Sequence, residues 1–317
     1  RCLPYSEKSV FIHSRINGWR NMKKPVFTGA SVAIVTPFHD DYSVDYAKLE
    51  ELIEMQIAGG TNCITICGTT GEAAALTDAE HKECIRFCVK VVNGRIPVIA
   101  GTGSNDTAYS LQLSLFAEDV GADALLQVTP YYNKTTQAGL IRHFTYLADR
   151  VHVPMILYNV PSRTGMSFHA DTYYELSKHP MINGVKEASG DFSLIAHTRH
   201  LCGDDLNIWS GNDDQVVPIL ALGGKGVVSV VSNVAPRLMS DLCSKFFAGD
   251  LESAAKLQIE NYDLMHNLFL EVNPIPVKTA MGMMGLCSPL MRLPLCEMGA
   301  ANKETLAQTL RSMGLLN

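Results

Sequence analysis

Short apolar runs alternate along the chain with longer segments in which apolar residues recur every three or four positions. Each run is bounded by Gly, Pro, Asn or Asp, the residues that commonly end strands. Because most runs are predominantly apolar rather than apolar only at alternate positions, they are typical of parallel strands that are covered on both faces. The eight predicted strands comprise residues 30–35, 63–67, 98–100, 124–128, 155–158, 182–185, 206–209 and 226–231.

The segments between these strands have the pattern of amphipathic helices, the clearest of them at residues 45–58, 78–92, 107–120 and 137–150. Thr77 is a suitable N-cap for the second of these helices, and Asp78 and Glu80 place negative charge in its first turn. Strand and helix alternate eight times with a repeat of about 30 residues. This pattern predicts an α/β fold of the (β/α)8 or TIM barrel type. A doubly wound open sheet is the alternative, because spacing alone does not show whether the sheet closes.

The two ends of the chain depart from this pattern. The strand signal stops after residue 248, and helices are predicted at residues 251–270, 276–284 and 303–313. We therefore predict a catalytic barrel at residues 22–248 and a C-terminal helical domain at residues 249–317. Residues 1–21 carry four basic residues against one acid and show no periodicity. We interpret them as a disordered leader, a tag or a wrongly assigned start, with a transit peptide as the alternative.

The composition argues against several classes of function. The 317 residues carry a formal net charge of -6, which provides no basic surface for nucleic acid or an anionic membrane. No apolar run approaches the roughly 20 residues needed to span a bilayer. The nine cysteines are scattered without the spacing of a metal site. We interpret them as buried free thiols of a protein in a reducing, cytoplasmic environment.

The most informative single residue is Lys186, which ends the sixth predicted strand and enters a loop containing Gly and Ser. In TIM barrels the active site lies at the carboxyl ends of the strands. Partial burial there disfavours the ammonium form, so that a neutral amine becomes available to form a Schiff base with a ketone or aldehyde. The simpler alternative is a lysine that reaches solvent or pairs with Glu187.

Other strand ends also carry groups suited to chemistry. The second strand is followed by the sequence Gly-Thr-Thr-Gly-Glu at residues 68–72, whose N–H groups and hydroxyls suit a carboxylate or an oxyanion. Tyr158 ends the fifth strand, where a phenol can relay a proton, and Arg163 is suited to a bidentate grip on a carboxylate. Of the neighbours Tyr131 and Tyr132, only one can face its own barrel if the chain is extended.

Five motifs together resemble a known family. They are Gly68-Thr-Thr-Gly-Glu72, Thr129-Pro-Tyr-Tyr-Asn133, Tyr158-Asn-Val-Pro-Ser-Arg-Thr-Gly165, Val185-Lys-Glu-Ala188 and Asn273-Pro-Ile-Pro-Val-Lys278. With these motifs the chain resembles the pyruvate-dependent Schiff-base lyases, and among them the dihydrodipicolinate synthase family. The resemblance covers about residues 22–317, which is nearly the whole chain.

The resemblance implies a catalytic set. Lys186 would form the Schiff base with pyruvate, with no metal or organic cofactor. Thr69, Tyr158 and Tyr132 would form a proton relay. Tyr132 would be contributed across a dimer interface, within a homotetramer built as a dimer of dimers.

The resemblance also implies how substrates are held. Thr70 would bind the carboxylate of pyruvate, and Arg163 would bind the carboxylate of the second substrate, aspartate-4-semialdehyde. Gly211 and Val228 would shape the pocket through backbone groups. The product would be 4-hydroxy-tetrahydrodipicolinate, an intermediate of diaminopimelate and lysine biosynthesis. Nucleic acid and membrane are not expected as partners.

Many members of the family are inhibited by lysine at an interface site. The positions of this chain that match that site are Ala74, His81, Asn105, Tyr109 and Tyr131. Tyr109 stands where the family has an acidic residue that binds the amine of lysine, and Asp78 stands where some members have His. Because the loss of an acid removes attraction for a cationic effector, we expect weak or absent inhibition by lysine.

Two alternatives remain at this stage. Another pyruvate-dependent aldolase, such as an N-acetylneuraminate or keto-deoxy-sugar-acid lyase, would share Lys186 and the tyrosines but differ around Arg163. A non-catalytic barrel with a binding role would be expected to have lost part of the relay, yet Thr69 and Tyr158 are both present.

Overall fold

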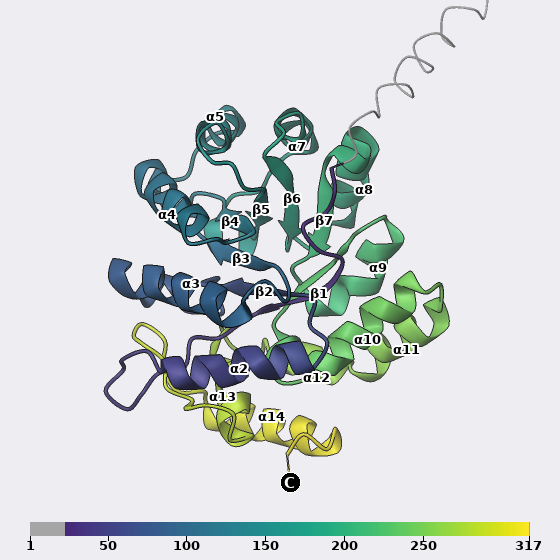
Figure 1. Cartoon of the computed structure of the whole chain (residues 1–317). Coiled ribbons are helices and arrows are strands. Elements are labelled where there is room, and N and C mark those ends of the chain that lie inside the picture. The colour runs from purple at the N-terminus through teal and green to yellow at the C-terminus, as the bar shows by residue number, and fades with distance from the viewer. Residues whose placement is uncertain (1–22, 317) are drawn as a thin grey trace, which may run out of the picture.

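The computed structural model describes residues 23–316, in which eight parallel strands close into a barrel surrounded by helices (Figure 1). The strands are β1 (Gly29–Ala33), β2 (Cys63–Ile66), β3 (Val98–Gly101), β4 (Ala124–Val128), β5 (Met155–Asn159), β6 (Ile182–Glu187), β7 (Asn207–Ser210) and β8 (Gly226–Ser229). Ser31 on β1 pairs with Cys63 on β2 and with Val228 on β8. The first strand therefore closes on the last, which confirms the TIM barrel and excludes the open sheet.

Helices follow the strands around the outside of the barrel. They are α2 (Tyr46–Ala58), α3 (Asp78–Val92), α4 (Thr107–Asp119), α5 (Gln137–Ala148), α6 (Pro161–Thr164), α7 (Ala170–Ser177), α8 (Phe192–Cys202), α9 (Val216–Ala221) and α10 (Pro236–Phe247). Thr77 caps α3 as predicted, and Glu80 completes a capping box with it. Such a box satisfies two N–H groups that the helix leaves free at its start.

Four further helices follow the barrel: α11 (Leu251–Glu260), α12 (Tyr262–Asn267), α13 (Ile275–Met283) and α14 (Ala300–Ser312). The sequence predicted one helix over residues 251–270, and this prediction is wrong in detail. The helix breaks at Asn261, whose side chain donates to the carbonyl oxygen of Leu257 at 2.8 Å. Side chains of this type compete with the backbone for its hydrogen bonds.

The interior of the barrel is a packed apolar core. Its inward-facing residues include Ala33, Cys63, Ile99, Leu126, Ile156, Tyr158, Trp209 and Val228. Phe27, two residues before β1, stacks on Trp209 with the ring centroids 5.1 Å apart. This stack helps to fill the amino end of the barrel, and in TIM barrels ligands bind at the carboxyl end of the strands.

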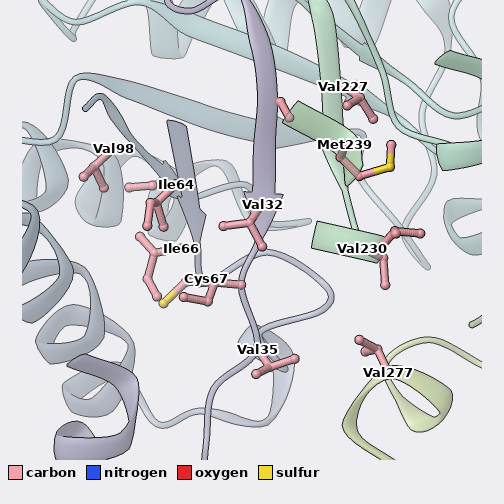
Figure 2. Packing of buried hydrophobic residues seen from close by; sticks show 14 of the residues in the cluster. Val32, Val35, Ile64, Ile66, Cys67, Val98, Val227, Val230, Met239 and Val277 are labelled. Carbon is pink, nitrogen blue, oxygen red and sulfur yellow. The ribbon is translucent and has the colours of Figure 1, made fainter. Parts of the chain in front are cut away.

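A second apolar core lies between the barrel and its helices. Val32 on β1 and Val227 on β8 pack there with Met239 on α10, and Val277 on α13 belongs to the same cluster (Figure 2). The C-terminal helices therefore share the outer core of the barrel, and α13 is held close to the strands.

Three further predictions concern the N-terminal leader, membrane-spanning helices and the cysteines. The interpretation of residues 1–21 lies outside the described residues. Within residues 23–316, no helix combines the length and the apolar content that crossing a bilayer requires. The cysteines that the structure describes are free thiols, all buried except Cys296, so the prediction of buried thiols is wrong at that position.

His143 on α5 provides a test of the fold by pH. One ring nitrogen bonds the hydroxyl of Thr107 at 2.8 Å, and the other is buried without a partner among the described residues. Burial lowers the pKa of His143 from 6.5 to about 4. The folded state therefore binds a proton less tightly than the unfolded state, and stability is lost as the pH falls from 6.5 toward 4.

This loss has an upper limit of about 3 kcal/mol. The variant His143→Asn keeps a neutral partner for Thr107, so its Tm should fall less between pH 7 and pH 5 than that of the parent protein. Equal falls in the two proteins, measured by calorimetry, would contradict the assignment.

Candidate active site

Lys186 lies inside the barrel, near the carboxyl end of β6. It pairs in register with Tyr158 on β5 and Trp209 on β7. Its side chain is only 6% exposed, and its Nζ atom lies 4.2 Å from the centroid of the Tyr158 ring. A Cβ atom at Gly211 would lie 3.2 Å from the Cε atom of Lys186. Glycine at this position therefore leaves room for the lysine side chain, and the amine and the phenol are neighbours.

The loop after β2 carries Thr69 and Thr70. It is a tight turn, in which the N–H of Gly71 donates to the carbonyl oxygen of Gly68 at 3.1 Å. A Cβ atom at Gly71 would lie 3.1 Å from the carbonyl oxygen of Ile34, so glycine lets the loop pack against the end of the first strand. Thr70 is buried, whereas Thr69 is partly exposed at the mouth of the barrel.

Arg163 lies on the short helix α6, which follows β5. Its guanidinium donates to the carbonyl oxygen of Asn273 at 3.1 Å. The side-chain amide of Asn273 in turn donates to the hydroxyl oxygen of Thr70 at 2.9 Å. One residue after the barrel therefore connects the two positions that were predicted to bind carboxylates.

A cavity of about 460 Å³ opens at this end of the barrel. Thr69, Tyr158 and Arg163 line it, and Lys186 is in contact with the ring of Tyr158. Val228 lies deeper, in the interior core. A larger cavity of about 630 Å³ lies among the C-terminal residues and includes none of the predicted site residues. The chemistry predicted from the strand ends therefore converges on the smaller cavity.

The same cavity reaches most of the positions that match the lysine site. Its lining includes Ala74, His81, Tyr109 and Tyr131. His81 is tied down, because its Nε2 atom bonds the carbonyl oxygen of Gly101 at 2.8 Å and burial lowers its pKa.

Asn105 is not part of the cavity lining. Its carbonyl oxygen accepts a hydrogen bond from the side chain of Asn133 at 2.9 Å. Tyr109 lines the cavity, and burial and the carboxylate of Asp78 raise its pKa. Asp78 itself forms an ion pair with Lys82 at 2.8 Å.

Tyr132 is set apart from the other candidates. Its side chain is 93% exposed and does not line the cavity, whereas its neighbour Tyr131 does. Its backbone is in the left-handed region, with φ of 65°, which is uncommon for a residue with a side chain. A single copy of the chain therefore does not bring Tyr132 to the lysine.

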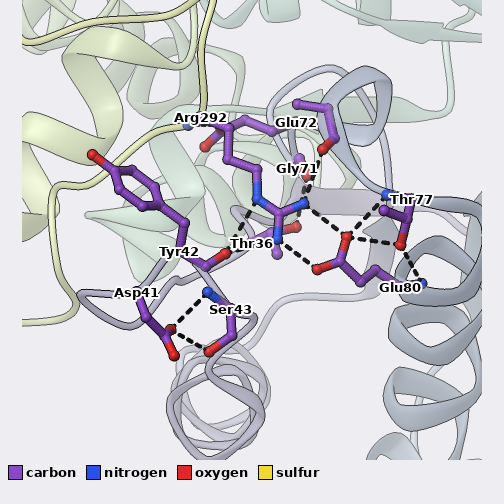
Figure 3. Close-up of polar contacts among 10 residues, drawn as sticks. Thr36, Asp41, Tyr42, Ser43, Gly71, Glu72, Thr77, Glu80 and Arg292 are labelled. Atoms are coloured by element: carbon purple, nitrogen blue, oxygen red, sulfur yellow. Dashed lines mark hydrogen bonds and ion pairs between the residues drawn. The ribbon is translucent and has the colours of Figure 1, made fainter.

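The structure adds residues to which the sequence assigned no role. Glu72 forms a buried ion pair with Lys278 on α13, with its Oε1 atom 2.7 Å from the lysine Nζ. Arg292 donates its backbone N–H to Glu72, and its guanidinium contacts Glu80 on α3 (Figure 3). Arg292 lowers the pKa of Glu80 to about 2. Glu72 and Lys278 lie within two of the motifs but 206 positions apart, so no local pattern indicated their contact.

A bound metal is not suggested by the side chains present. Among the described residues, no three His, Cys, Asp or Glu side chains come together as metal ligands would. The groups near the cavity are the phenol of Tyr158, the hydroxyl of Thr69 and the guanidinium of Arg163 in its lining, with the amine of Lys186 and the hydroxyl of Thr70 buried next to that lining. Such a set can form a covalent bond to a carbonyl carbon, move protons and hold carboxylates.

Comparison with known proteins gives consistent matches. The family model described as "Dihydrodipicolinate synthetase family" matches residues 26–313. The chain is 52% identical over 293 residues to the 4-hydroxy-tetrahydrodipicolinate synthase of Thermoanaerobacter sp. (strain X514), covering 92% of this chain and 98% of the relative. The crystal structure of dihydrodipicolinate synthase from Thermotoga maritima is similar with a TM-score of 0.90 and 40% identity, covering 92% of this chain and 100% of that one. The chloride-inhibited enzyme from Acinetobacter baumannii, complexed with pyruvate, gives a TM-score of 0.90 and 42% identity at the same coverage.

Proposed function

This chain belongs to the dihydrodipicolinate synthetase family, and from that premise we propose that it condenses pyruvate with aspartate-4-semialdehyde to give 4-hydroxy-tetrahydrodipicolinate. The reaction is that of a lyase in diaminopimelate and lysine biosynthesis. The observation that carries the proposal is the buried amine of Lys186 beside the phenol of Tyr158. The pyruvate bound to the Acinetobacter relative supports the identity of the first substrate.

The first half of the reaction activates pyruvate. The neutral amine of Lys186 adds to the keto carbon, and the resulting carbinolamine loses its hydroxyl as water to leave a cationic iminium. Tyr158 gives the proton that this hydroxyl needs in order to leave, and Thr69 passes protons to and from the phenol. The hydroxyl of Thr70 donates to the carboxylate of pyruvate. The phenolate left on Tyr158 then takes a methyl proton from the iminium, which yields the nucleophilic enamine and restores the phenol.

The second half builds and releases the product. The enamine carbon attacks the aldehyde carbon of aspartate-4-semialdehyde, and the relay gives a proton to the new alkoxide. Arg163 holds the carboxylate of this substrate. The substrate's own amine then adds to the iminium carbon and displaces the amine of Lys186, which closes the ring and frees the enzyme. All bonds are made with groups of the chain and the two substrates, so no cofactor is needed.

The assembly belongs to the same proposal. We propose a cytoplasmic homotetramer in which Tyr132 completes the relay of a neighbouring subunit. The exposed side chain of Tyr132 and its left-handed backbone support a role outside its own subunit, because a fixed unfavourable conformation is expected where function requires it.

The proposed reaction can be tested by trapping and turnover together. Incubation with pyruvate and borohydride should leave a reduced adduct on Lys186, identified by mass spectrometry of peptides. The enzyme should then turn over aspartate-4-semialdehyde in preference to sugar-acid aldehydes. Absence of the adduct would favour a non-catalytic barrel. An adduct combined with turnover of sugar-acid aldehydes alone would favour another aldolase.

Arg163→Ala should act on the second substrate. The loss of a charged hydrogen bond of about 1.5–3 kcal/mol lowers kcat/KM for aspartate-4-semialdehyde by roughly 10- to 150-fold. The amount of pyruvate trapped on Lys186 should stay the same. Arg163→Lys, which keeps the charge but loses the planar fork, should give an intermediate value. A fall in trapping as large as the fall in turnover would contradict the assigned role.

Inhibition by lysine should be weak or absent. Tyr109 offers no negative charge to the amine of lysine, and Asp78 is already paired with Lys82. Steady-state rates should therefore hardly change when lysine is raised to the millimolar range. Tyr109→Glu adds a carboxylate beside the cavity and should increase sensitivity to lysine. Inhibition of the parent protein below one millimolar would contradict this prediction.

A further inference from the structure

Glu72 ends the loop that carries Thr69 and Thr70, and it does so in a conformation that needs support. Its backbone lies in the left-handed region, with φ of 54°, which costs a residue with a side chain roughly 1–2 kcal/mol. Its N–H donates to the carbonyl oxygen of Thr69 at 3.0 Å. The position of Thr69 therefore depends on whatever holds Glu72 in place.

Two groups from the C-terminal segment hold the carboxylate of Glu72. One oxygen accepts from the Nζ atom of Lys278 at 2.7 Å, and the other accepts from the backbone N–H of Arg292 at 2.9 Å. The side chains of Glu72 and Lys278 are 1% and 0% exposed. Both oxygens are thus fixed by residues more than 200 positions later in the chain.

Lys278 and the loop are also both bonded to the segment that follows β1. Lys278 also donates to the carbonyl oxygen of Thr36 at 2.9 Å, and its ammonium lies 4.2 Å from the centroid of the Phe38 ring. The hydroxyl of Thr36 donates to the carbonyl oxygen of Gly71 at 2.6 Å. Figure 3 shows Thr36, Gly71 and Glu72 together with Arg292 at this junction. The segment after β1, the loop and α13 therefore constrain one another.

A gain in stability does not by itself explain the buried ion pair between Glu72 and Lys278. Two buried charges lose their hydration, and an apolar pair of similar volume often stabilises a protein equally well or better. Burial indeed lowers the pKa of Lys278, against the opposing influence of Glu72. What the ion pair adds over an apolar contact is direction, because each oxygen of the carboxylate must meet its own donor.

We infer that Glu72 and Lys278 are positioning residues, which fix the loop that presents Thr69 to the cavity beside Tyr158 and that carries the buried Thr70. The carboxylate of Glu72 and the ammonium of Lys278 bond each other and backbone groups of the protein, so the pair acts through the loop that it holds. The inference rests on the proposed function, since Thr69 serves there in the relay and Thr70 binds pyruvate. Loss of the pair should therefore change pyruvate binding and turnover even when the protein is fully folded.

Three variants separate positioning from stability. Glu72→Gln leaves the charge of Lys278 unpaired, so both Tm and pyruvate affinity should fall. The double variant E72Q/K278M removes that charge as well, so Tm should recover. Its half-saturation concentration for pyruvate, measured from the borohydride-trapped fraction, should stay at least about 5-fold above the parent value, with kcat also lowered.

Glu80→Gln is the matched control. It breaks the ion pair between Arg292 and Glu80. Arg292 belongs to the same C-terminal segment, but its partner Glu80 lies on α3 and not in the loop. Tm should fall, while the half-saturation concentration for pyruvate should remain that of the parent.

A double variant with parental Tm and parental pyruvate affinity would overturn the inference, as would an E80Q control that loses as much affinity as E72Q. If the parent protein formed no adduct with pyruvate, the proposed function would fail and the inference with it. A parental adduct combined with an unchanged double variant would overturn the inference alone.

Discussion

Lys186→Met is expected to abolish the pyruvate adduct and to lower turnover by a factor on the order of 10⁴ or more, because it removes the nucleophile itself. Methionine has a similar length and is apolar, so it should fill the space beside Tyr158 and keep a favourable contact with the ring. Tm should therefore stay close to that of the parent protein. Activity assays, mass spectrometry after borohydride and calorimetry measure the three quantities.

The second buried lysine provides the control for this experiment. Lys278 is fully buried, but Glu72 and the carbonyl oxygen of Thr36 already accept hydrogen bonds from its ammonium group. Its Nζ atom is committed to these acceptors and does not line the cavity, so it is not placed to attack a substrate. An adduct on Lys278, or one that survives in the Lys186 variant, would show that the Schiff base had been assigned to the wrong residue.

Of the single substitutions considered, Lys278→Met should lower the free energy of unfolding most. It leaves the carboxylate of Glu72 buried with only the N–H of Arg292 as a partner, and breaking a buried pair in this way costs about 3–5 kcal/mol. A loss of this size corresponds to a fall in Tm of roughly 4–8 °C for a protein of this size. Calorimetry at neutral pH measures it.

A surface lysine serves as the comparison. Lys256 pairs with Glu260 at 3.7 Å, and both side chains are more than half exposed. Exposed pairs contribute little, so Lys256→Met should change the free energy of unfolding by about 0.5 kcal/mol or less. Equal losses in the two variants would show that burial of the pair at Glu72 is not what makes it matter.

The strands were the part of the fold most open to prediction. A strand buried on both faces is apolar at most positions, and the runs at residues 124–128 and 155–158 accordingly agree with β4 and β5 to within one residue. The strand predicted at residues 226–231 was less accurate, because β8 ends at Ser229. There the hydroxyl oxygen of Ser229 accepts from the N–H of Ser232 at 2.9 Å, a local contact that no pattern of apolar residues reports.

The residues of the candidate site also fall into two groups, those that the sequence could predict and those that it could not. Lys186, Tyr158 and Thr69 could be predicted to meet because the carboxyl ends of parallel strands share one rim of the barrel. Asn273 and Lys278 could not be given a role, because their partners lie far away in the sequence and the loops between them carry no periodic signal. Tyr132 stays a prediction, since its place depends on a second subunit.

The contacts of Asn273 and Lys278 have a consequence for protein engineering. A fragment that stops at residue 248 would retain every strand of the barrel and the nucleophilic amine. It would lack the amide that supports Thr70, the carbonyl that orients Arg163 and the ammonium that fixes Glu72. The smallest autonomous catalyst that can be cut from this chain therefore extends at least to Arg292, and swapping C-terminal segments between relatives offers a way to retune substrate affinity without altering the barrel.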